Sequence, residues 1–190
     1  MDYTFEQIKG DKNLSDIIAI REKVFINEDH YPKEAITSSF DKTSTHFIAK
    51  KENRIIGVIT VVTGTENLPI EKFVDLKKFK DKPMAEIQKL AVLPEERKGF
   101  VSLGLMVLAY EYAKEHGAKR IVIFSLERKS ENIELYKKFG FNTLLKFDFY
   151  DVGKACAMAL DIDNNSSYEK DQKNVRRANL IKKLVKILKI

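Results

Sequence analysis

The stretch from Ala85 to Leu105, AEIQKLAVLPEERKGFVSLGL, constrains the fold more than any other part of the chain. An apolar run typical of a strand stops at Pro94, a charged turn follows, and Val101 begins a run with helical periodicity. The start of a helix carries unpaired N–H groups and the positive end of the helix dipole, and Arg97 and Lys98 add charge beside it. The segment therefore predicts either a site for a phosphate or pyrophosphate, or an ordinary strand-to-helix connection with solvated charges.

The remaining segments predict one mixed α/β domain. The chain has 190 residues, of which 44% are hydrophobic, which suffices for one compact core. Helices that follow single strands in the middle of the chain favour parallel pairing there. Gly57 predicts a bulge or a close backbone approach inside a hairpin. The expected strands are 3–9, 46–51, 54–63, 85–93, 121–126, 141–150 and 154–160, and the expected helices are 14–27, 101–116 and 130–139.

A second informative stretch runs from Leu126 to Phe141, LERKSENIELYKKFGF. It predicts a helix that carries Tyr136 one turn before the terminating Gly140. One interpretation is a packed aromatic residue whose hydroxyl tip is hydrogen-bonded. The other is a phenol that faces a reaction site, and the stretch by itself leaves both open.

Together, the strand motif E-I-x-x-L-A-V-x-P-E-x-R and the helix ending L-Y-x-K-x-G-F resemble the GNAT superfamily of N-acyltransferases. The resemblance covers most of residues 1–162 and implies an α/β fold, a mixed sheet of about seven strands flanked by helices. It implies that strands 85–93 and 121–126 splay apart and that the pantetheine arm of acyl-CoA or acetyl-CoA lies between them. The implied cofactor-binding residues are Leu90, Ala91 and Val92 along the arm, and Arg97, Lys98, Gly99, Phe100, Val101 and Ser102 at the pyrophosphate.

The resemblance also implies a catalytic pair. Glu86 is expected to accept the proton of the attacking amine, and Tyr136 matches the acid that protonates the departing thiolate. Because side chains alternate along a strand, Glu86 is expected to share one face with Gln88, Leu90 and Val92. A carboxyl group in this role needs a raised pKa or a water relay near neutral pH.

Some residues depart from the usual superfamily pattern. Phe100 and Ser102 stand where the pyrophosphate turn normally has glycine or alanine, and Lys129 stands in place of a common asparagine. These departures resemble the acyl-homoserine-lactone synthases and the long-chain N-acyl amino acid synthases, a subgroup that often uses acyl carrier protein as the donor. Within that subgroup, Thr60 and Lys89 replace arginines, and the chain has no tryptophan.

The C-terminal segment 163–190 is a candidate basic amphipathic helix. Between Lys170 and Ile190 there are eight basic residues and one acid, a net charge of +7, so the rest of the chain carries −1 of the total of +6. Apolar residues recur there at spacings of three and four. The segment is expected to dock on its own domain or a second subunit, to lie on an anionic membrane surface, or to bind an acidic carrier protein.

Composition excludes several other classes of protein. The basic excess belongs to the tail, so no nucleic-acid partner is expected. The three histidines and the lone Cys156 have no metal-ligand spacing, and Cys156 is expected to be a buried strand residue. No signal sequence or membrane span is apparent, so we expect a cytoplasmic protein, with peripheral contact at the inner membrane surface if the tail binds lipid.

The sequence therefore predicts an N-acyltransferase that moves an acyl group from acyl-CoA or acyl carrier protein to a small primary amine by direct attack. The alternatives are a non-catalytic module that binds an acyl thioester and a membrane-associated interaction module. Amine identity, acyl length and oligomeric state are not predicted.

Overall fold

A computed structural model describes residues 3–64, 66–97 and 100–162. Seven strands form one sheet with the order β1-β2-β3-β4-β5-β7-β6. Neighbouring strands pair antiparallel except β4 and β5, which are parallel, as the helices around the middle strands predicted. The strands are β1 Tyr3–Lys9, β2 Thr45–Lys51, β3 Arg54–Val62, β4 Met84–Val92, β5 Arg120–Leu126, β6 Asn142–Phe149 and β7 Gly153–Asp161.

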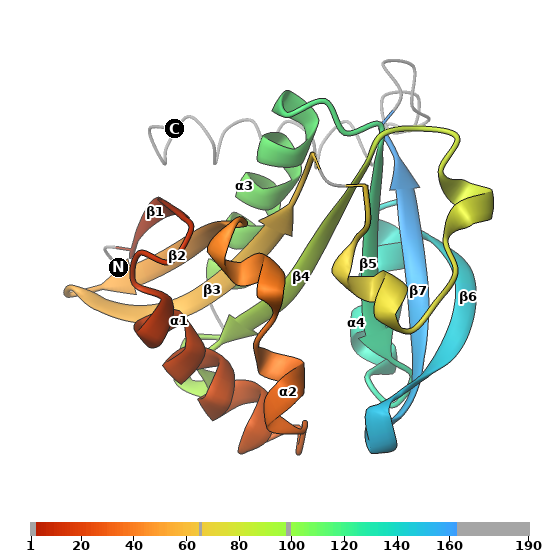
Figure 1. Cartoon of the computed structure of the whole chain (residues 1–190). Coiled ribbons are helices and arrows are strands. Elements are labelled where there is room, and N and C mark those ends of the chain that lie inside the picture. Colours follow the sequence, from red (N-terminus) through yellow and green to blue (C-terminus); the bar gives the residue numbers. More distant parts are fainter. Residues whose placement is uncertain (1–2, 65, 98–99, 163–190) are drawn as a thin grey trace.

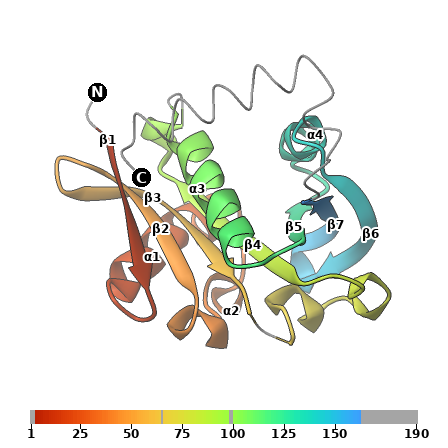
Figure 2. The ribbon, with the colours of Figure 1, turned by 90° about the horizontal axis from the view of Figure 1, so that it is seen from above.

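Helices cover both faces of the sheet. Figure 2 shows α1 and α2 on one side of it and α3 and α4 on the other. The α-helices are α1 Leu14–Arg21, α2 Lys33–Ile36, α3 Val101–Glu115 and α4 Ser130–Lys138, and α1 continues into a π-helical turn, η1 Glu22–Ile26. The 3₁₀ turns are η2 Ser39–Lys42, η3 Pro69–Lys72, η4 Lys77–Phe79, η5 Pro94–Glu96 and η6 Tyr150–Val152.

Helix α3 packs on the sheet through a stripe of apolar residues. Val101, Leu105 and Leu108 are buried at spacings of four and three, as the sequence pattern predicted. The helix lies tightly on β3 because Gly57 has no side chain. A Cβ atom there would lie 3.1 Å from Leu105 Cδ1 and 3.2 Å from Val92 Cγ2. The close approach expected at Gly57 is therefore confirmed.

The expected strands and helices are confirmed within a few residues at their ends. The first helix is irregular at both ends. Asn13 has a left-handed φ of 56° and makes no capping hydrogen bond, because an N-cap side chain needs extended backbone. The last turn widens into the π-helix η1 instead of continuing as α-helix. The predicted basic helix of residues 163–190 lies outside the described residues.

Two apolar clusters fill the interior. The larger joins α1 and α3 to strands β1–β5, and the smaller joins the η3 region to β5, β6 and β7. Cys156 of β7 is buried, as expected for a small apolar residue. Within the part of the chain that the structure describes, every helix is too short or too polar to cross a membrane.

Candidate functional site

Strands β4 and β5 begin side by side and then separate. Their pairing covers only three steps, from Met84 with Arg120 to Glu86 with Val122. Beyond these residues the two strands diverge toward the lower edge of Figure 1. A cavity of about 1400 Å³ opens at the divergence, lined by β4, β5, α3, α4 and the η3 region. The splay implied by the family resemblance is thus present.

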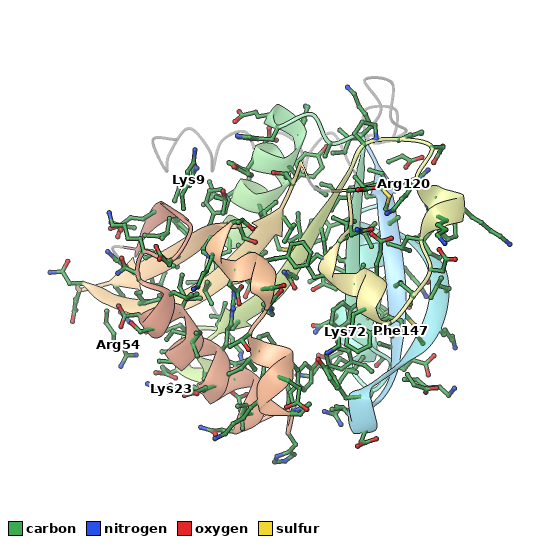
Figure 3. The ribbon with its side chains drawn as sticks, in the orientation of Figure 1. Lys9, Lys23, Arg54, Lys72, Arg120 and Phe147 are labelled. Atoms are coloured by element: carbon green, nitrogen blue, oxygen red, sulfur yellow. The ribbon has the colours of Figure 1, made fainter. Side chains whose placement is uncertain are left out.

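Ion pairs hold the end of the sheet where β4 and β5 still pair. Arg120 of β5, labelled in Figure 3, donates to Asp161 of β7 through Nε at 2.6 Å and to Asp81 through Nη1 at 2.6 Å. The same guanidinium donates to Phe79 O at 2.6 Å. These bonds tie the start of β5 to β7 and to the connector that precedes β4.

A bulge interrupts β4 beside the cavity. Gln88 pairs with Thr60, but Ala91 already pairs with Val58, so β4 has one more residue than β3 in this interval. Lys89 takes the left-handed conformation, with φ of 53°, that accommodates the extra residue.

The bulge corrects one prediction from the sequence. Val92 pairs with Gly57, which faces α3, whereas Gln88 pairs with Thr60, whose side chain faces α1. Glu86 and Gln88 therefore share a face, as predicted, but Val92 does not lie on it. The prediction of a single face through Leu90 and Val92 was wrong because strict alternation ends at the extra residue.

Glu86 lines the cavity and is fully buried. Its Oε2 accepts a hydrogen bond from the Ile70 N–H at 2.8 Å, whereas its Oε1 has no hydrogen-bond partner among the described residues. Burial raises the pKa of Glu86 to about 8, although the Ile70 N–H and the charge of Lys89 lower it. The carboxyl group is therefore mostly protonated at pH 7 and becomes a base near pH 8.

A buried network of polar side chains lies behind this wall. Arg21 donates through Nη1 to both carboxylate oxygens of Asp41 at 3.0 Å and to Ile36 O at 2.9 Å. Its Nη2 donates to Thr60 Oγ1 at 2.6 Å. Since Arg21 and Asp41 are both buried, this ion pair joins α1 to the η2 turn and to β3 inside the core.

His46 completes the network as a neutral ring. Its Nε2 lies 2.9 Å from Asp41 O, a pure acceptor, so Nε2 carries the proton. Its Nδ1, 2.8 Å from Thr60 Oγ1, then accepts the hydroxyl proton of Thr60. Burial lowers the pKa of His46, in keeping with this uncharged form.

Lys89 and Gln88 extend the polar surface into the cavity. The Lys89 side chain is only 10% exposed, and its Nζ lies 3.8 Å from Asp41 Oδ1, beyond hydrogen-bond distance. Burial, and then the neighbouring charge of Arg21, lower the pKa of Lys89 to about 8. Gln88 is also buried, and its Nε2 has no hydrogen-bond partner in the described structure.

In the sequence, Lys89 stands out only as a departure from a family pattern, and Gln88 has no predicted role of its own. A signal was present, because a lysine in a central strand is rarely buried unless it is paired. The bulge that turns Lys89 toward Asp41 had no such signal.

Tyr136 of α4 lines the same cavity from another element. It is half-buried, and its ring centroid lies 6.0 Å from that of Phe141. Burial raises its pKa to about 12, so the hydroxyl keeps its proton across the physiological range. The structure thus places Glu86 and Tyr136, 50 residues apart in the sequence, on the wall of one cavity.

The residues predicted to bind the pyrophosphate at the turn before α3 differ in their exposure. Phe100 is 65% exposed, Val101 is fully buried in the core and Ser102 lines the cavity. Lys98 and Gly99 lie outside the described residues. Because Val101 packs inward, its side chain cannot contact a ligand at this position, whereas the backbone N–H groups of the first turn of α3 and the Ser102 side chain can.

Arg97 is held by other groups of the protein. Its Nε donates to Val92 O at 2.9 Å, and its two terminal nitrogens donate to the carboxylate of Glu28 at 2.8 and 2.9 Å. The adjacent Asp29 pairs with Lys129, and its carbonyl oxygen accepts from Arg128. The predicted phosphate ligand Arg97 is thus already paired with a carboxylate.

Aromatic rings form an apolar wall on the far side of the divergence. Phe149 lies at the centre, with ring centroids 5.1 Å from Phe73 and 4.9 Å from Phe124. Lys72 Nζ donates to the Tyr150 hydroxyl at 2.9 Å beside this wall, and the position of Lys72 can be followed in Figure 3. The cavity therefore has a polar side at β4 and an aromatic side at η3, β5 and β6.

Comparison with known proteins places this site in a family. A family model of the N-acyl amino acid synthase FeeM matches residues 16–163. The uncharacterized N-acetyltransferase YjcF of Bacillus subtilis (strain 168) is 23% identical over 145 residues, which cover 76% of this chain and 89% of that protein.

Solved structures share the fold. FeeM from uncultured soil microbes superposes with a TM-score of 0.72 at 17% identity, covering 84% of this chain and 90% of that chain. A chain of the NatC complex, solved with a Gag peptide and CoA, has a TM-score of 0.62 at 16% identity, covering 86% of this chain and all of that chain. The protein has the GNAT fold, belongs to the FeeM family of N-acyl amino acid synthases and is an N-acyltransferase.

Proposed function

We propose that this acyltransferase forms N-acyl amino acids by moving an acyl group from acyl-CoA to the amino group of an amino acid. The observation that carries the proposal is the single cavity between β4 and β5, where Glu86 and Tyr136 lie together. Two comparisons support it, because the family model is named for an N-acyl amino acid synthase and the NatC complex was solved with CoA.

Mass spectrometry of lipid extracts tests the proposal directly. Cells that express the chain should contain N-acyl amino acids that are absent from cells with an empty vector, and the masses report donor and acceptor together. A Glu86→Gln strain is the control for products made by the host. Extracts in which no new amide carries a free carboxylate would contradict the proposal.

The donor occupies the gap between the strands in this proposal. Its pantetheine arm runs along β4 from Leu90 through Ala91 to Val92, beyond the last pairing of β4 with β5. Its phosphates meet the turn from Arg97 to Ser102, and its acyl chain meets the aromatic wall around Phe149. Acyl carrier protein presents the same phosphopantetheine arm and is the alternative donor.

The proposed reaction needs no covalent intermediate on the enzyme. The amine nitrogen attacks the thioester carbonyl carbon, the C–N bond forms and the C–S bond breaks. Glu86 in its carboxylate form takes the proton that the amine loses, and the Tyr136 hydroxyl gives a proton to the departing sulfur. The products are an amide and a free thiol, and the proton held by Glu86 restores Tyr136 through solvent.

Replacing Glu86 by Gln should remove a pH-dependent advantage. Because the pKa of Glu86 is about 8, the carboxylate is present above pH 8 and is lost as the pH falls through it. The ratio of kcat/KM between wild type and Glu86→Gln should therefore grow from pH 6 to pH 9, reaching about 10²–10⁴. Taking this ratio cancels the titration of the amine itself. A ratio that stays constant with pH would mean that Glu86 positions the substrate and does not accept a proton.

Replacing Tyr136 by Phe should slow transfer and leave the fold intact, because only the hydroxyl is removed. The expected loss in kcat at saturating donor is about 10²–10⁴. Thiol release reports the rate, and thermal melting reports the fold. Tyr150→Phe is the matched control, since Tyr150 lines the same cavity but its hydroxyl is bonded to Lys72. Equal rates for Tyr136→Phe and the control would exclude Tyr136 from the reaction.

A separate proposal concerns the segment 163–190, which we propose is a basic appendage that attaches the domain to an anionic membrane surface. Its support is the charge of +7 between Lys170 and Ile190, against −1 for the rest of the chain. Each basic residue near such a surface contributes roughly 1 kcal/mol, screened within a Debye length of about 8 Å.

Deleting residues 163–190 should therefore abolish binding to vesicles that contain phosphatidylglycerol and leave the thermal melting temperature unchanged. Co-sedimentation measures the first and circular dichroism the second. Vesicles of phosphatidylcholine alone are the control for apolar adsorption. If the shortened chain melts markedly lower and the full chain never binds vesicles, the segment packs on its own domain instead.

A further inference from the structure

Strand β4 carries three buried side-chain polar atoms without a hydrogen-bond partner in the described structure, on residues that line the cavity. Among the described residues, Glu86 Oε1, Gln88 Nε2 and Lys89 Nζ have no hydrogen-bond partner, and all three side chains line the cavity. Each of these side chains is nine-tenths buried or more. Buried polar atoms without partners are uncommon, because each loses its bonds to water and gains none in the protein. Their concentration on one strand points to a ligand that completes them.

The three atoms have complementary bonding roles. Gln88 Nε2 and Lys89 Nζ are donors, and Glu86 Oε1 is an acceptor when the group is ionised. A ligand that satisfies all three must offer acceptor oxygens and a donor close together. An α-amino acid has this combination, with a carboxylate and an amino group on one carbon.

The charge of the buried network favours the same kind of ligand. Arg21 and Asp41 neutralise each other at 3.0 Å, and His46 is neutral. Glu86 is mostly protonated at neutral pH, so Arg21, Asp41 and Lys89 together keep a net charge of +1. The Lys89 ammonium lies 3.8 Å from the Asp41 carboxylate, which is already hydrogen-bonded to Arg21. An excess of buried positive charge is unfavourable, so an anionic group from a ligand would stabilise this wall and allow Glu86 to ionise toward the ligand's amino group.

The backbone of Lys89 has a left-handed conformation, which is unfavourable for a lysine within a strand. A φ of 53° is strained for a non-glycine residue in the middle of a strand. The bulge places the Lys89 side chain beside Gln88 and Asp41. Local strain of this kind is found where the backbone re-aims a side chain at a binding site.

We infer that Lys89 and Gln88 bind the carboxylate of the acceptor and that Glu86 Oε1 receives its amino group, so that the enzyme selects α-amino acids with a free carboxylate. This inference rests on the proposed function, because it assigns the specificity of the same cavity. Amino acid amides and simple alkylamines lack the anion that Lys89 requires and are poor acceptors. Lys89 is thus a specificity-determining residue that contacts the substrate and transfers no proton.

The test compares an amino acid with its carboxamide. Thiol release from decanoyl-CoA is measured with each of the common amino acids, and the best acceptor is then paired with its own amide. Wild type should favour the amino acid, and Lys89→Met should raise its KM about 10- to 100-fold, the loss expected for one charge-assisted hydrogen bond. The kcat/KM for the amide should change little, so the ratio between the two acceptors collapses. Lys89→Arg should restore most of this ratio.

Lys72→Met is the matched control. Lys72 lines the same cavity but is bonded to Tyr150, so the preference for the amino acid should survive this change. A merely structural role of Lys89 would lower kcat/KM for both acceptors together. An amino acid preference that persists in Lys89→Met with transfer intact overturns the inference, and so does a wild type that uses amide and amino acid equally.

Binding without turnover separates this inference from the proposed function. Titration calorimetry of the full-length protein with the same amino acids and amides requires no donor. If no amine releases thiol from the donor but the amino acids bind and Lys89→Met abolishes this binding, the proposed function fails and the carboxylate site stands. If no amino acid binds and transfer proceeds to amines without a carboxylate, the site is overturned while acyl transfer stands.

Discussion

The early end of the pairing between β4 and β5 determines most of what the protein can do. After Glu86 and Val122 the two strands no longer pair with each other, although each remains hydrogen-bonded to the strand on its other edge. Strand β5 is held to β7 along its length, and β4 to β3, so neither can move to close the gap. The sheet therefore contains an opening between two well-anchored halves, and backbone groups that would be satisfied in a continuous sheet become available to a ligand.

The buried polar residues behind the gap hold one wall of the cavity in place. A buried ion pair such as Arg21 with Asp41 contributes little net stability, because removing both charges from water is costly. Here the pair also fixes positions, since Arg21 reaches Ile36 O at the end of α2 and Thr60 on β3. The wall of the cavity is thus rigid on the side where Glu86 and Lys89 lie, and its unpaired atoms have defined positions.

The sequence could predict the parts of this arrangement that depend on neighbouring residues, but not those that depend on contacts between distant residues. Elements such as α3 were predictable because their signals, Pro94 and the apolar spacing that starts at Val101, are local. Glu86 and Tyr136 could be paired only through a family resemblance, since they come from separate elements. The bulge at Lys89 was not predicted, because the extra residue exists only relative to β3. The pairing of Arg97 with Glu28 spans 69 residues and leaves no local signature.

The two basic parts of the cavity differ in how their charges are compensated. Near α3, Arg97 donates hydrogen bonds to Glu28 through both terminal nitrogens, and beyond the gap Lys129 pairs with Asp29. An anion that arrives there must displace a carboxylate, so much of the attraction is offset by the pair that is lost. At Lys89 the Asp41 carboxylate is already engaged by Arg21, and an arriving anion breaks no hydrogen bond of the ammonium in the described structure. A carboxylate therefore loses less by binding at Lys89, beside Glu86, than at the basic residues of the turn.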